Sequence, residues 1–135
     1  MKSGGMVIIK SDATYNDTVF RLNEALEMHE IVPMAWIDHA ELARAAGLSL
    51  RPLLLVVFGN PSVGTPLMRT RPALGIDLPL KLLVWEAEDS VWIGYNEMAW
   101  LAARHRLPND RPELAAMRNA IQSVASQTAG ERVRQ

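Results

Sequence analysis

Cysteine is absent from this sequence, and its absence excludes disulfide bridges, thiolate nucleophiles and cysteine-bound metals together. Long apolar runs are missing as well. Residues 6–9 form only a short apolar run, whereas a signal peptide needs a longer one. The longest apolar stretch, at residues 52–58, falls far short of a membrane-spanning helix. We therefore expect a cytoplasmic protein with no membrane partner.

Neither sign of charge dominates the sequence. Fourteen Lys and Arg residues stand against fifteen Asp and Glu residues, for a formal net charge of -1. Nucleic-acid binders usually carry a basic excess or a basic stripe, so we expect no nucleic-acid partner. Small basic clusters at Arg69 with Arg71 and at residues 104–106 are interpreted as solvated helix ends.

Histidine is also scarce. The sequence contains three, at His29, His39 and His105, and none of them shows the spacing of a metal-binding pair. We therefore expect no metal site and no cofactor.

The length and composition are typical of one globular domain. Of its 135 residues, 49% are apolar and 21% are charged, which is enough to build a core without covalent cross-links. We expect a single α+β domain over residues 6–127. The polar residues 128–135 are expected to form a frayed C-terminal tail.

Apolar patterns predict five strands, at residues 7–10, 32–37, 53–58, 78–86 and 91–95. Helices are expected after the first, second and fifth of these strands, with a short helix at 66–70 and a last helix after Pro112. The last helix has an apolar stripe spaced as on one helix face, made of Leu114, Met117, Ile121 and Val124. This order favours an α+β fold with a mixed five-stranded sheet and helices mainly on one face.

A sheet covered by helices on one face leaves the other face to be explained. Leu83, Trp85 and Trp92 fall on the second face of the predicted hairpin, which is too apolar to be left in water. A second subunit is the simplest cover, so we expect a homodimer. The alternative is that the last two helices wrap around to this face.

Residues 59–68, GNPSVGTPLM, follow a strand that is apolar on both sides. Gly59 and Gly64 have the spacing of a phosphate-binding loop. That loop also requires Lys and then Ser or Thr, where this sequence has Thr65 and Pro66, so nucleotide hydrolysis is excluded. Asn60-Pro61 and Thr65-Pro66 instead pair a capping residue with proline, which predicts helix starts whose free N–H groups could bind an anion.

Three motifs follow one another in the sequence: GNPSVGTPLM at residues 59–68, DLPLKLLVWE at 77–86, and a strand that ends with Tyr95-Asn96. Together with Ile37-Asp38-His39-Ala40, they resemble the bacterial and archaeal family called domain of unknown function 302. The resemblance covers roughly residues 7–107. It implies a small α+β dimeric domain of bacterial type, and it implies no reaction.

Three functions remain open at this point. The first is a non-catalytic homodimer that binds a small anionic or amphipathic molecule. Its pocket would be formed by Asn60, Thr65, Met68, Asp77, Lys81 and Trp85. The second is an enzyme with acid–base chemistry by Asp77 and Lys81, assisted by His39. The third is a structural or regulatory interaction module, marked by residues 66–68 buried against a partner with no cavity nearby.

Overall fold

The computed structural model of the chain describes residues 1–131. Six strands form one sheet in the order β1-β2-β6-β5-β4-β3. They are β1 (Lys2–Ser3), β2 (Met6–Lys10), β3 (Ala35–Asp38), β4 (Leu53–Phe58), β5 (Leu80–Ala87) and β6 (Ser90–Asn96). The five expected strands are therefore confirmed, and a two-residue strand extends the sheet at one edge.

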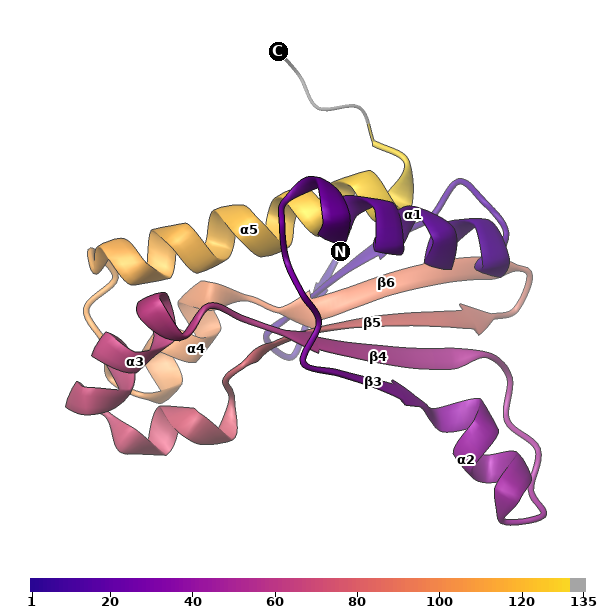
Figure 1. The fold of residues 1–135 in the computed structure, drawn as a ribbon, viewed down its shortest axis with the longest axis horizontal. Coiled ribbons are helices and arrows are strands. Elements are labelled where there is room, and N and C mark those ends of the chain that lie inside the picture. The colour runs from indigo at the N-terminus through magenta and orange to yellow at the C-terminus, as the bar shows by residue number, and fades with distance from the viewer. Residues whose placement is uncertain (132–135) are drawn as a thin grey trace.

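The helices are α1 (Tyr15–Met28), α2 (His39–Ala45), α3 (Pro61–Thr70), α4 (Met98–Arg104) and α5 (Pro112–Ala129), with the 3-10 helix η1 (Pro72–Ile76) after α3. Helices α1 and α5 lie along one face of the sheet, as Figure 1 shows, and they pack against each other. The α+β fold and the placement of helices mainly on one face are confirmed. None of the helices within residues 1–131 combines the length and apolar character needed to cross a membrane.

The expectation of a mixed sheet is wrong, because every neighbouring pair of strands is antiparallel. A mixed sheet would have needed two strands joined through a helix, such as β2 and β3 on either side of α1, to pair in parallel. Instead β6, β5 and β4 lie between them. Hairpin pairing of β5 with β6 brings the C-terminal strands into the centre of the sheet, and a sequence order alone does not reveal this insertion.

The core lies between the sheet and the pair α1 and α5. On β5, Leu80, Leu82 and Val84 are buried and alternate with half-buried residues, as a strand with one covered face requires. The four expected apolar residues of the last helix are all buried: Leu114, Met117, Ile121 and Val124. Burial of this stripe fixes α5 on the sheet.

The C-terminal boundary needs a correction. Thr128 and Ala129 were assigned to a frayed tail, but they are 0% and 2% exposed in the last turn of α5. The helix ends at Gly130, whose φ of 91° is a left-handed conformation that glycine adopts at low cost. Residues 132–135, the rest of the expected tail, lie outside the described residues.

The opposite face of the sheet has no helix over it in the described chain (Figure 1). The strand registers place the following apolar residues on this face: Met6, Ile8, Ile37, Leu53, Leu55, Val57, Leu83, Trp85 and Trp92. We call it the open face. Its apolar side chains are half-buried, because they shield only one another.

Candidate functional site

A cavity of about 650 Å³ opens where β4 and β5 meet α3 and α5. This volume is within the range of small-molecule sites. Its wall is mainly apolar and comes from five parts of the chain: the α1–β3 connection, the end of β4, α3, the start of β5 and α5. The apolar lining residues include Ile31, Met34, Phe58, Val63, Met68, Leu78, Leu80 and Met117.

Local sequence explains why the cavity forms at this place. Gly59 follows β4 and lies beside Pro79, and a β-carbon on Gly59 would lie 3.2 Å from the Pro79 Cβ. A larger residue would push the two segments apart. On α5, Ala116 and Ala120 are one helical turn apart and both line the cavity. Their short side chains leave the space that larger residues would fill.

Helix α3 begins at Pro61 and not at Pro66 as the sequence predicted. Asn60 is its N-cap, and the Ser62 N–H donates to Asn60 Oδ1 at 2.9 Å. The second capping pair, Thr65-Pro66, falls inside the helix. Pro66 has no N–H for the Ser62 carbonyl, so one bond of the helix is missing, but capping at Asn60 and burial of Leu67 still hold it in place.

The expected anion site at this helix start is not open to a ligand. Pro61 has no N–H, and the Val63 and Gly64 N–H groups both donate to the Asn60 carbonyl, at 2.9 and 3.0 Å. With Ser62 bonded to the cap, no N–H group of the first turn is left over.

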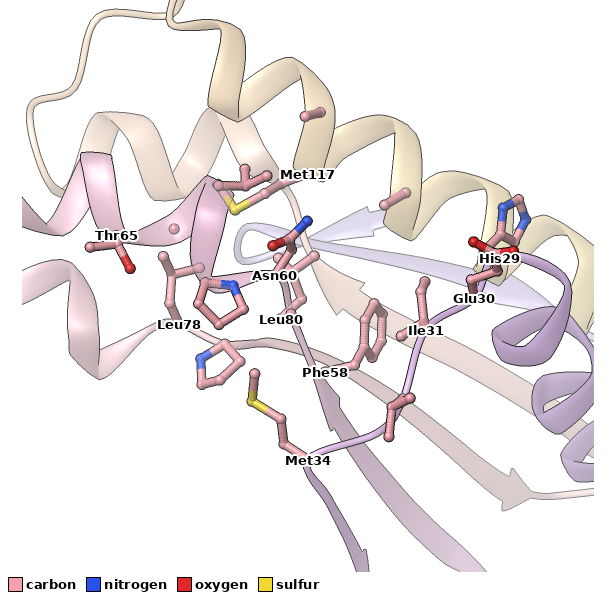
Figure 2. Close-up of a pocket in the computed structure, with 18 of the residues that line it drawn as sticks. His29, Glu30, Ile31, Met34, Phe58, Asn60, Thr65, Leu78, Leu80 and Met117 are labelled. Atoms are coloured by element: carbon pink, nitrogen blue, oxygen red, sulfur yellow. The ribbon is translucent and has the colours of Figure 1, made fainter.

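Figure 2 shows how the polar lining residues are spread along the cavity. His29 and Glu30 lie together at the end of α1, Thr65 lies at the other side of the view, and Asn60 lies between them near Leu80. Sequence patterns missed His29 and Glu30, because both are exposed residues after a helix end and belong to no motif. The small residues Ala116 and Ala120, one turn apart on α5, are a sequence feature that could have indicated space beside that helix.

Three of the six residues expected to bind a ligand line the cavity, namely Asn60, Thr65 and Met68. Asp77, Lys81 and Trp85 do not. Lys81 and Trp85 point to the open face of the sheet, as their alternation with buried Leu82 and Val84 requires. Trp85 pairs with Trp92 across β5 and β6. The cation and the aromatic wall assigned to the pocket are thus on the wrong side of the sheet.

Asp77 lies in a different cluster. Its carboxylate accepts hydrogen bonds from Arg104 at 3.0 Å, and His105 Nε2 lies 2.5 Å from its other oxygen. The Asp77 and His105 side chains are only 11% and 8% exposed. The basic cluster at residues 104–106, interpreted as a solvated helix end, therefore supplies two partners to a buried acid.

Lys81 completes the surroundings of this cluster without touching the carboxylate. Its Nζ donates to the backbone carbonyls of Asp77 and Pro79, at 3.1 and 3.2 Å. Burial lowers the pKa of Lys81, and the negative charge of Asp77 opposes that shift. His39, the third residue of the acid–base hypothesis, starts α2 at the opposite end of the molecule (Figure 1). The three groups do not meet in one cleft.

No set of three or more His, Asp and Glu side chains within residues 1–131 is arranged to hold a metal ion.

Comparison with known proteins gives a family and a fold. The family model described as "Domain of unknown function DUF302" matches residues 7–127. The crystal structure of an uncharacterized conserved DUF302 protein from Bacillus stearothermophilus superposes with a TM-score of 0.80 and 18% sequence identity. The superposition covers 93% of this chain and 99% of that chain. At this identity the likeness concerns the fold alone.

Curated relatives of the chain carry a functional name. The Fluoride-specific ion channel FluC 1 of Brucella suis biovar 1 is 34% identical over 129 residues, which is 94% of this chain and 51% of the relative. The protein of the same name from Brucella abortus biovar 1 has the same identity, with 48% of its length covered. The chain thus spans about half the length of these relatives, and the channel function in their names is that of the whole relatives.

Proposed function

Because the chain belongs to the family described as "Domain of unknown function DUF302", which names no activity, we propose a function from the cavity itself. The protein binds a small amphipathic molecule in the cavity beside α3 and does not react with it. The observation that carries this proposal is an apolar space of about 650 Å³ with a few polar groups on its wall.

The composition of the wall supports a ligand with an apolar body. Phe58 and Leu80 are 1% and 5% exposed and form the floor with Leu78. Three methionines, Met34, Met68 and Met117, also line the cavity, and methionine side chains adapt to ligands of different shape.

The placement of the titratable groups supports binding over catalysis. His29 and Glu30 are the titratable side chains on the wall among the described residues, and both are exposed. General acid–base catalysis works best with groups held at the reacting atoms by burial and neighbours. Asp77 and His105 are more deeply buried, but they lie outside the cavity and their side chains are hydrogen-bonded to each other.

Titration with Nile red, a neutral dye that fluoresces in apolar surroundings, tests the proposal. We expect saturable binding by the wild type and strong loss in Ala120→Leu, which fills the cavity from α5. Ala115→Leu is the matched control, because Ala115 is an exposed residue of α5 outside the cavity wall. Absence of binding by the wild type, or equal loss in both variants, would contradict the proposal.

We further infer that the binding protein is a homodimer that joins through the open face. Helix α2 supports this inference. It has seven residues and none of them is buried, and so short a helix needs packing to be stable. Leu42 of α2 is 60% exposed, and the nearby Leu48 and Leu50 are 67% and 48% exposed. One chain thus carries both an exposed apolar helix and an apolar sheet face, and two copies related by two-fold symmetry could each cover the other's.

A second candidate is a regulatory interaction module, and the Brucella relatives favour it. In them, the part similar to this chain makes up about half of a protein named as an ion channel. A binding domain joined to a channel is suited to control it. The original mark of this alternative, residues 66–68 buried away from any cavity, is not met, because Met68 lines the cavity and Leu67 packs in the chain's own core.

The module hypothesis is tested on the Brucella suis relative, by fluoride efflux from vesicles before and after deletion of the half similar to this chain. We expect a channel that conducts but has altered activity. Efflux identical in rate and fluoride dependence would exclude a regulatory role for that half.

A further inference from the structure

The charge on the cavity wall is concentrated at one end. Glu30 and His29 follow the last turn of α1, and no Lys or Arg from residues 1–131 lines the cavity. Apart from His29, the only acidic or basic side chain that lines the cavity among these residues is thus the acid Glu30. Lys81, the cation assigned to the pocket from sequence, lies on the far side of the sheet.

The start of α3 does not offset this acid. Its N–H groups bond to the side chain and the carbonyl of Asn60. An anionic group in the cavity would find no free backbone N–H at this helix start and, among residues 1–131, no Lys or Arg side chain on the wall.

The end of α1 adds to the negative field. A helix of 14 residues carries a partial negative charge at its C-terminus. The last turn of α1 has no basic residue to neutralise it. The carbonyls of Leu26 and Glu27 already accept backbone hydrogen bonds. The attraction for a cation therefore comes from the helix end as a whole and from the Glu30 carboxylate.

The backbone of Glu30 is a second reason to single out this residue. Its φ is 55°, a left-handed conformation that is uncommon outside glycine. Glycine is the usual residue at this position after a helix. Here a carboxylate occupies the position instead, on the wall of an apolar cavity.

We propose that the molecule bound in the cavity is an amphipathic cation: an aliphatic amine whose ammonium lies beside Glu30 at the end of α1. Its hydrocarbon part packs against Phe58 and Leu80. This inference rests on the proposed function, since it names the class of ligand for the same cavity. It replaces the anionic ligand that the sequence suggested.

Three probes with the same chain length separate charge from apolar burial: octylamine, 1-octanol and octanoate. Each displaces Nile red from the wild-type protein at low salt and about pH 8, where a solvent-exposed imidazole is neutral and an alkylamine is charged. We expect octylamine to bind on the order of 10-fold more tightly than octanoate, with 1-octanol between them. The preference falls as salt is added.

Glu30→Gln tests the residue itself, since it removes the charge and keeps the size. We expect octylamine and octanoate to bind within about 2-fold of each other in this variant, with binding of 1-octanol unchanged. Glu24→Gln is the matched control, because Glu24 is an exposed residue of α1 that does not line the cavity. It keeps the wild-type preference.

The outcomes distinguish this inference from the function on which it rests. Tightest binding by octanoate, or an unchanged preference for octylamine in Glu30→Gln, overturns the cationic ligand and leaves the binding function standing. Failure of Nile red and all three probes to bind overturns both.

Discussion

Asp77 is the residue whose surroundings differ most from those of an ordinary surface acid. Its side chain is 11% exposed, and both carboxylate oxygens contact side chains at the end of α4. Arg104 is also held from the other side, with its guanidinium 5.6 Å from the centre of the Trp100 ring. The cluster ties the η1–β5 connection to α4.

Asp77→Asn removes the charge and keeps the volume. We expect a loss of about 2 kcal/mol in the free energy of unfolding, because His105 and Arg104 keep their donors beside a weaker acceptor. Urea unfolding measures the loss, and we expect the dependence of the unfolding free energy on urea concentration to be unchanged. Asp110→Asn, at an exposed position, is the control and changes stability by less than about 0.5 kcal/mol. Equal stability of the two variants would show that the cluster is not stabilising.

At the scale of single elements, α3 is built with weak helix residues and held by its neighbours. It contains Gly64 and Pro66, and its side-chain cap is Asn60. Gly64 is buried within the helix, with room for one methyl group. A β-carbon there would meet Leu78 Cδ1 at 3.5 Å and Met68 Cε at 3.6 Å, which are ordinary contact distances.

Gly64→Ala should therefore stabilise the protein by about 0.5–1 kcal/mol, because alanine loses less backbone entropy in a helix. The added methyl group also narrows the cavity and should weaken dye binding.

Gly94→Ala on β6 is the comparison. Its β-carbon would lie 2.9 Å from Trp85 Cζ3 and 3.0 Å from Met6 Cε, so we expect a loss of about 1–2 kcal/mol. Thermal unfolding of both variants and the wild type tests this prediction. A Gly64→Ala protein that is less stable than the wild type would contradict it.

At the scale of the whole molecule, the chain has more surface than a compact monomer needs. Its accessible surface is 8263 Å², against roughly 7,000 Å² for a compact monomer of its mass. The open face and α2 are the regions that a second copy would cover.

Leu55→Arg tests the homodimer, since Leu55 lies on the open face between Ile37 and Leu83. Light scattering after size-exclusion chromatography should give a dimer for the wild type at micromolar concentration and a monomer for the variant. Met28→Arg changes a 74% exposed residue of α1 and should remain dimeric. A wild-type protein that is monomeric throughout would rule out this assembly.

The sequence by itself determined the elements and the family. Strand alternation and helix stripes are local patterns, since they depend on which residues near one another in the chain share a face. For this reason the α+β fold, the buried stripe of α5 and the bare face with Leu83, Trp85 and Trp92 were all predicted. The motif at residues 59–68 also located the region of the cavity, through Asn60, Thr65 and Met68.

Only the tertiary structure decided the order of the strands and the chemistry of the site. Insertion of β4, β5 and β6 between β2 and β3 is a long-range event, and no local pattern records it. Alternation along β5 already turns Lys81 and Trp85 away from the face that the helices cover, whereas long-range packing decides which segments line the cavity and brings Glu30 to it. Residues close in sequence were separated by the two faces of one sheet, whereas an acid from a distant helix end came to line the cavity.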